Sequence, residues 1–136
     1  MARTVQVAID CADPAALSRF WAEALGYVLQ PPPDGHDSWE SWLRAMGVPE
    51  SEWNSASAVI DPDGAGPRVY FQRVPEGKAV KNRQHLDIRV RGGREAIPGE
   101  ADRLVRLGAT VVGPKDERGE HWVVMQDPEG NEFCLT

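Results

Sequence analysis

Apolar and polar residues alternate along several short stretches of the chain, which is typical of β-strands with one buried face. The same alternation predicts strands at residues 5–11, 27–30, 57–60, 68–74, 82–90, 109–112, 122–126 and 132–135. In residues 82–90 the polar and aliphatic side chains fall on opposite faces, with His85, Asp87 and Arg89 against Leu86, Ile88 and Val90. A strand of this kind indicates a sheet with one packed face and one face that lines a cavity.

Three other stretches carry apolar residues at helical spacing, and each lies between residues typical of helix ends. The predicted first and last positions are Asp13 and Gly26, Asp37 or Ser38 and Gly47, and Pro98 and Gly108. In the third helix, the predicted buried stripe is Ala101, Leu104 and Val105. Residues 113–119 are polar and are expected to form a loop.

The second half of the chain repeats the order of the first half. Leu25-Gly26 matches Leu107-Gly108, and the turn at residues 61–64 matches that at residues 127–130. The repeat predicts an α+β fold of two tandem βαβββ modules, whose sheets curve around a central cavity. One domain would cover residues 1–136, with modules at about 4–76 and 82–136 and a Trp-rich insertion at about 31–56 in the first module. The alignment of the two copies places Gln6 opposite His85.

Composition excludes several classes of partner. The chain has 136 residues and a formal net charge of −6, with no cluster of basic residues. Nucleic acids and anionic membranes are therefore not expected partners. No apolar stretch has the length of a membrane span. Two cysteines, Cys11 and Cys134, form neither a disulfide framework nor a zinc-finger spacing. We expect a cytoplasmic protein with reduced thiols.

The order and spacing of several motifs carry a resemblance that covers nearly the whole chain. They are residues 7–9 with Asp13-Pro14, Phe20-Trp21, residues 25–27, 70–76, 81–87, 107–111 and 127–133. In these motifs the chain resembles the vicinal oxygen chelate superfamily, and within it a glyoxalase-like domain of the glyoxalase, bleomycin-resistance and dioxygenase kind. The resemblance implies pairing of modules within one chain or across a two-fold dimer. Exposed sheet edges favour a homodimer.

The resemblance also implies a divalent metal, such as Zn, Ni, Mn or Fe, held by one side chain from each of four strands. By position these are Gln6, Gln72, His85 and Cys134. Superfamily members with a working metal usually carry Glu where this chain has Cys134. Gln6 and Gln72 are neutral, so only His85 and a Cys134 thiolate would bind an ion strongly, a set that Zn²⁺ tolerates. We therefore expect no conventional metal site.

Each candidate residue also has a simpler structural interpretation. His85 is either a metal ligand or a cavity-wall histidine that is hydrogen-bonded to Gln6 or Asp87. Cys134 is either a small buried residue or a nucleophile paired with His85. Trp39 and Trp42 either bury one side of their helix against the sheet or form a pocket wall over it.

Two classes of function remain open. The first is a module that binds a small organic ligand, with Gln6, Gln72, His85, Asp87, Trp39, Trp42 and Cys134 as the predicted binding residues. The alternative is a metal-dependent enzyme, namely a lyase, isomerase or dioxygenase that acts on a small oxygenated substrate. In that case His85 and Glu132 are the candidate catalytic residues. The incomplete ligand set favours the binding module.

Overall fold

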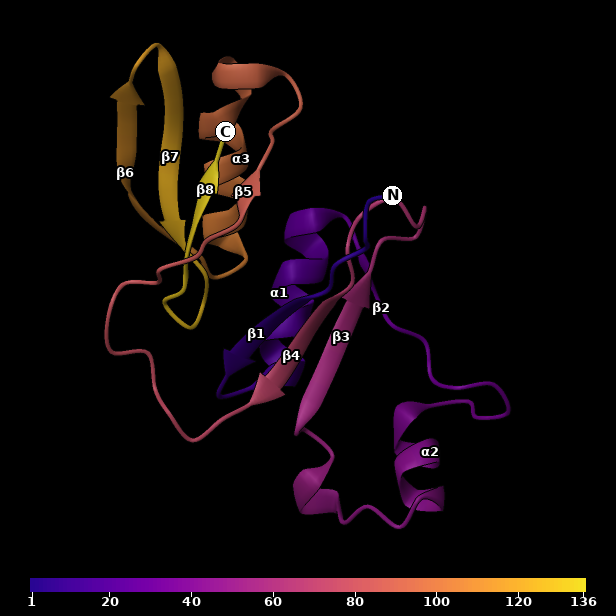
Figure 1. The fold of residues 1–136 in the computed structure, drawn as a ribbon. Helices are drawn as coiled ribbons and strands as arrows, with labels where there is room; N and C mark the ends of the chain where they lie inside the picture. The colour runs from indigo at the N-terminus through magenta and orange to yellow at the C-terminus, as the bar shows by residue number, and fades with distance from the viewer. The chain divides into compact units, whose positions relative to one another are not determined.

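The computed structural model describes all 136 residues, which form two compact units, Met1–Gly77 and Lys78–Thr136 (Figure 1). Unit 1 contains strands β1 (Val7–Cys11), β2 (Val28–Leu29), β3 (Ala56–Ile60) and β4 (Val69–Arg73), with helices α1 (Pro14–Leu25) and α2 (Trp39–Ala45) and a 3-10 turn (Glu50–Glu52). Unit 2 contains β5 (Asp87–Ile88), β6 (Thr110–Glu117), β7 (Glu120–Gln126) and β8 (Glu132–Leu135), with helix α3 (Ile97–Arg106) and a 3-10 turn (Gly93–Ala96).

The two units share one topology. The first sheet has the order β1-β4-β3-β2 and the second β5-β8-β7-β6, so each places its first strand beside its last. That pair is parallel in both units, and the other neighbours are antiparallel. The predicted α+β fold of tandem βαβββ modules is confirmed. No helix has both the length and the apolar character needed to cross a membrane.

In unit 1, α1 covers one face of the sheet (Figure 1). Asp13 caps the helix by accepting the amide of Ala16 at 3.1 Å, and Gly26 ends it with a φ of 68°, both as the sequence predicts. The core on this face includes Leu17, Trp21, Val59, Val69 and Phe71, all buried. The opposite face of the sheet therefore carries the other residue of each alternating pair.

Unit 2 packs α3 against its own sheet, with one departure from the sequence-based expectation. Leu104 is fully buried and Ala101 nearly so, as predicted, but Val105 is 44% exposed. Ile97, at the start of the helix, is buried instead. The buried stripe of α3 is therefore Ile97, Ala101 and Leu104.

The prediction of a loop at residues 113–119 is wrong. These residues continue β6 as far as Glu117, after an irregularity between Val111 and Gly113. A two-residue turn, Arg118 and Gly119, then joins β6 to β7, and both residues have positive φ values, of 53° and 81°. Turns of this kind match the twist of a hairpin.

The predicted strand at residues 82–90 is shorter than expected, because β5 covers only Asp87 and Ile88. Its alternation is nevertheless present: His85 and Asp87 are exposed, while Leu86 and Ile88 are half-buried. The amide of Cys134 donates to the carbonyl of Leu86 at 3.0 Å, so the backbone is already paired with β8 before β5 begins. His85 thus lies just before the strand on its polar side.

Candidate ligand-binding site

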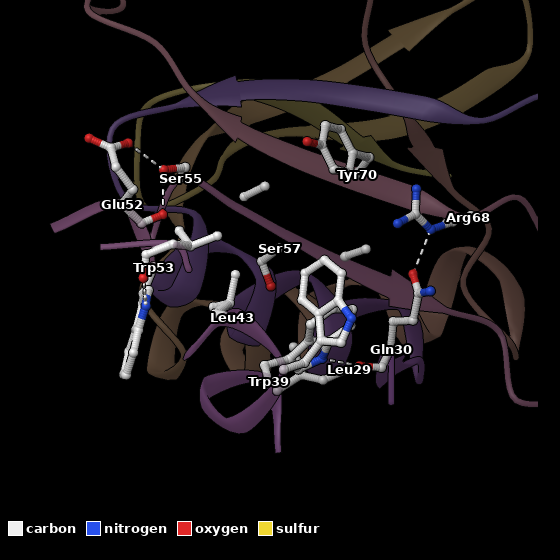
Figure 2. A pocket seen from close by; sticks show the side chains of 14 residues that line it. Leu29, Gln30, Trp39, Leu43, Glu52, Trp53, Ser55, Ser57, Arg68 and Tyr70 are labelled. Atoms are coloured by element: carbon white, nitrogen blue, oxygen red, sulfur yellow. Dashed lines mark hydrogen bonds between the residues drawn. The ribbon is translucent and has the colours of Figure 1, made fainter. Parts of the chain in front are cut away.

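The open face of the first sheet forms the floor of a pocket of about 510 Å³ (Figure 2). This volume lies in the range of small-molecule sites. The lining residues are Leu29, Gln30, Trp39, Trp42, Leu43, Val48, Glu52, Trp53, Ser55, Ala56, Ser57, Ala58, Arg68 and Tyr70. Small side chains at Ala56 and Ala58 leave room above the sheet. The insertion supplies the facing wall, because α2 and the segment after it carry the three tryptophans.

Two of the three tryptophans are held in place by hydrogen bonds from their indole N–H groups. The indole N–H of Trp39 donates to the carbonyl of Gln30 at 2.7 Å, and that of Trp53 donates to the carbonyl of Val48 at 2.9 Å. Trp39 and Trp42 pack edge to face, with ring centroids 5.7 Å apart. Trp39 and Trp53 are therefore fixed before any ligand arrives, and Trp42 packs against one of them.

Helix α2 contains no buried residue, although it carries two tryptophans. Trp39 is 37% exposed, and Trp42 is half-buried. Neither ring is fully buried against the sheet, and both line the pocket.

Asn54 anchors the insertion to the start of α1. Its side-chain oxygen accepts the amide of Ala15 at 2.9 Å, and its side-chain nitrogen donates to Asp13 at 2.9 Å. The hydrogen bond from Asn54, with that from the Ala16 amide, lowers the pKa of Asp13. At the other end, Ser38 caps α2 by accepting the amide of Ser41 at 3.0 Å.

Arg68 is the one basic residue in the lining. Its Nε donates to the side-chain oxygen of Gln30 at 2.7 Å, and its Nη1 donates to that of Gln6 at 2.6 Å. The guanidinium also lies over the ring of Tyr70, at 5.3 Å from the centroid. Gln6 therefore does not line the pocket itself but contacts Arg68, which does. Gln72 donates to Asp10 at 2.8 Å and does not line the pocket either.

Unit 2 has a second cavity, of about 430 Å³, on its own sheet. Its lining is mostly charged or polar: Lys81, His85, Asp87, Lys115, Glu117, Glu120, Trp122, Val124, Glu132, Cys134 and Thr136. Asp87 lies opposite Cys134 in the register of β5 and β8, and His85 Nε2 lies 3.2 Å from Asp87 Oδ1. The potential ligand atoms of His85, Asp87 and Cys134 all lie within 4.8 Å of one another. The structure thus brings together three residues that the sequence analysis singled out.

The protonation of Cys134 bears on this cluster. Burial and the nearby Asp87 carboxylate raise the pKa of the thiol, although Lys81 opposes the shift. A thiol with a raised pKa is mostly protonated at neutral pH and is therefore a poor nucleophile, and a metal ion that bound it would have to displace its proton.

Glu132, the candidate general base, already has partners. Its carboxylate accepts the amide of Asn82 at 3.0 Å and lies 3.2 Å from Nζ of Lys78. Burial would raise the pKa of Glu132, but the amides of Asn82 and Glu132 and the ammonium of Lys78 together lower it. Glu132 is therefore stabilised as a carboxylate, and protonating it would weaken these contacts.

The shared topology identifies equivalent positions in the two units. Ala8 lies opposite Tyr70 in unit 1, as Asp87 lies opposite Cys134 in unit 2. If Gln6 corresponds to His85, the counterpart of Cys134 is Tyr70 rather than Gln72. Gln72 lies two residues further along β4, or about 6–7 Å away. On this alignment the position inferred from the sequence as Gln72 falls on Tyr70, because the sequence alone could not fix the register of β4.

Comparisons with known proteins agree with this topology. The sequence model of the glyoxalase-like domain matches residues 6–136. The chain belongs to the glyoxalase-like domain family. No curated protein sequence matches it. Membership in this family also agrees with the resemblance to the vicinal oxygen chelate superfamily that the sequence motifs carry.

Solved structures with this fold are distant in sequence. One is a glyoxalase/bleomycin resistance protein/dioxygenase family enzyme from Burkholderia phytofirmans, with a TM-score of 0.66 and 17% identity over 96% of this chain and 94% of that one. Another is a mutant of the fosfomycin resistance protein FosX from Listeria monocytogenes, complexed with Mn(II) and a dihydroxypropylphosphonic acid. It has a TM-score of 0.66 and 11% identity over 99% of this chain and 89% of that one. At these identities the likeness shows the fold.

The metal implied by the resemblance fits the residues of one unit only. In unit 1, the side-chain oxygen of Gln6 already accepts a hydrogen bond from Arg68, and this cation would repel a metal ion. The equivalent position on β4, Tyr70, offers only a phenol as a ligand. In unit 2, His85, Asp87 and Cys134 offer nitrogen, oxygen and sulfur donors, which suit a zinc-like ion. A glyoxalase-like domain with this sequence thus has donors for a three-residue site within unit 2.

Proposed function

We propose that this glyoxalase-like domain binds a small, flat, largely apolar organic molecule in the tryptophan-lined pocket of unit 1, without using a conventional metal. The exposure of α2 carries the proposal, because its tryptophans contribute nothing to the core and face the pocket instead. Fixed aromatic rings over a floor of small residues favour planar ligands. The hydrogen bonds of Trp39 and Trp53 limit the ordering that binding would otherwise require.

Replacing Trp42 with alanine is expected to weaken the binding of 2-naphthamide, a neutral planar probe, by tenfold or more. Burial of an aromatic contact contributes roughly 1.5–3 kcal/mol, and removal of Trp42 also takes away the ring against which Trp39 packs. Isothermal titration calorimetry with the purified full chain measures the dissociation constant.

Trp122→Ala is the matched control, because Trp122 is also half-buried but lines the cavity of unit 2. It should leave the dissociation constant of 2-naphthamide unchanged. The proposal would be wrong if the probe failed to bind the wild-type chain at millimolar concentration. Loss of binding in Trp122→Ala with retention in Trp42→Ala would also contradict it.

A second candidate function, a metal-dependent enzyme, is favoured by the cluster of His85, Asp87 and Cys134. When bound there, a divalent ion would act as a Lewis acid. His85 and Cys134 would hold it, and Asp87 would add an oxygen donor. The thiol would have to lose its proton, against the burial that raises its pKa.

If the cluster binds metal, adding Co²⁺ to the chain should give a thiolate-to-cobalt absorption band in the near ultraviolet. Cys134→Ser should abolish the band, since a hydroxyl cannot supply it, and His85→Ala should weaken cobalt binding at least tenfold. His121→Ala is the control, because His121 pairs with Asp116 at 2.9 Å and lies outside the cluster. Absence of the band in wild-type protein at neutral and alkaline pH would rule out this candidate.

A further inference from the structure

We propose that the ligand of the unit 1 pocket carries an anionic group, such as a carboxylate, and that Arg68 is the residue that selects it. This inference rests on the proposed binding function and defines the chemical class of its ligand. A flat apolar body would lie among the tryptophans, with its acidic group at the Arg68 end of the pocket. Figure 2 shows Arg68 beside Gln30, at the opposite end of the view from Glu52.

The guanidinium of Arg68 is positioned but not saturated. An arginine has five N–H donors. One on Nε is used by Gln30 and one on Nη1 by Gln6, which leaves three N–H groups for a ligand. Stacking over Tyr70 fixes the plane of the group as well as its position. A planar fork held in this way is suited to a carboxylate, which it can bind through two parallel hydrogen bonds.

The charge of Arg68 has no carboxylate partner within the structure. Both of its hydrogen-bond acceptors are neutral amides, and none of the ion pairs of the chain includes it. Glu52 is the one acidic residue of the lining, and it is paired with Arg73 at 3.1 Å and with Ser55 at 2.8 Å. The pocket therefore contains one uncompensated positive charge, half-buried beside an apolar wall.

A carboxylate on the ligand is expected to increase the binding affinity through its hydrogen bonds to Arg68. Hydrogen bonds to a charged group contribute roughly 1.5–3 kcal/mol, about 10–100-fold in affinity. The neutral amide of a similar ligand would gain less, and the apolar wall strengthens the difference because it lowers the local dielectric. Arg68 is thus expected to govern selectivity between acid and amide, while the tryptophans govern affinity for the ring.

The test compares 2-naphthoate with 2-naphthamide, which share one ring system and differ in charge, by calorimetry at pH 7.5 and low ionic strength. Wild-type protein should bind the naphthoate at least about tenfold more tightly. Arg68→Met keeps an unbranched apolar stem but removes the charge, so it should abolish this preference and weaken the binding of the naphthoate far more than that of the amide. Arg68→Lys should keep part of the preference, because it retains the charge without the fork.

Arg44→Met is the matched control, since Arg44 carries the same charge and lies 5.2 Å from the ring centroid of Trp53 but does not itself line the pocket. It should keep the preference for the naphthoate. Equal binding of both probes by wild-type protein would overturn the role of Arg68 and leave the proposed binding function standing. Binding of neither probe would overturn both. If Arg68→Met lost the amide as well, Arg68→Lys would decide, and a lysine variant that bound the amide without any preference for the acid would count against the proposal.

Discussion

Replacing Phe71 with alanine is expected to lower the free energy of unfolding of unit 1 by about 3–5 kcal/mol. The Phe71 side chain is fully buried in the middle of β4. Phe71 lies opposite Ser57 in the pairing of β3 and β4, so their side chains point to the same face of the sheet. The hydroxyl of Ser57 donates to that of Ser18 in α1 at 2.8 Å, so this is the face that α1 covers. Its removal would leave a large cavity between sheet and helix. Denaturant unfolding followed by circular dichroism measures the change.

Tyr70→Ala is the companion variant, because Tyr70 is the preceding residue of the same strand and points to the pocket. It should cost clearly less stability than Phe71→Ala, since Tyr70 is only half-buried, but it should weaken the binding of 2-naphthoate by removing the ring beneath Arg68. Equal destabilisation by both variants would mean that the two faces of β4 are assigned wrongly, since a shift of one residue exchanges them.

The faces of β4 were predictable from sequence because alternation alone determines them. Val69 and Phe71 are buried, while Tyr70 and Gln72 lie on the other side, as the pattern indicates. The ends of α1 were predictable for a similar reason, since Asp13, Pro14 and Gly26 act through local geometry. The repeat then made the second sheet predictable from the first.

Local patterns could not reveal the length of β6. Lys115, Asp116 and Glu117 are polar on both faces, so no alternation identifies them as a strand. They are in the sheet because the Arg118-Gly119 turn directs β6 back along β7. Arginine rarely adopts a positive φ, and the turn was therefore not recognisable by composition. In this segment the hydrogen bonds to β7, rather than the hydrophobic pattern of the sequence, determine that the residues form a strand.

The residues of the candidate site likewise include some that sequence patterns could reveal and some that they could not. Trp39 and Trp42 were recognised because they interrupt a repeat that does not need them. Arg68 was missed as a site residue because its role depends on side chains far along the chain, Gln6 and Gln30. The pairing of His85 with Asp87 was one of the contacts left open by the sequence, whereas a contact between Gln6 and a guanidinium was not foreseen.

The insertion itself allows a sharper test of where binding resides. In unit 1, β2 and β3 are joined by residues 30–55, while the equivalent β6 and β7 are joined by the two residues Arg118 and Gly119. The amide of Gln30 donates to the carbonyl of Ala58 at 2.9 Å, so the two strands are already paired at the base of the insertion. A short connection at this point is therefore compatible with the sheet.

Replacing residues 31–54 with a linker of about four Gly and Ser residues is expected to abolish the binding of 2-naphthoate and 2-naphthamide while unit 1 still unfolds cooperatively. The wall of tryptophans would be absent, but the core beneath α1 would remain. Loss of the Asn54 hydrogen bonds to α1 should cost about 1–3 kcal/mol. Asn54→Ala is the control, because it removes the same anchor, should cost similar stability, and leaves the tryptophans present to bind the probes. Binding retained by the shortened chain would place the ligand elsewhere, and loss of the unfolding transition would show that the insertion belongs to the core.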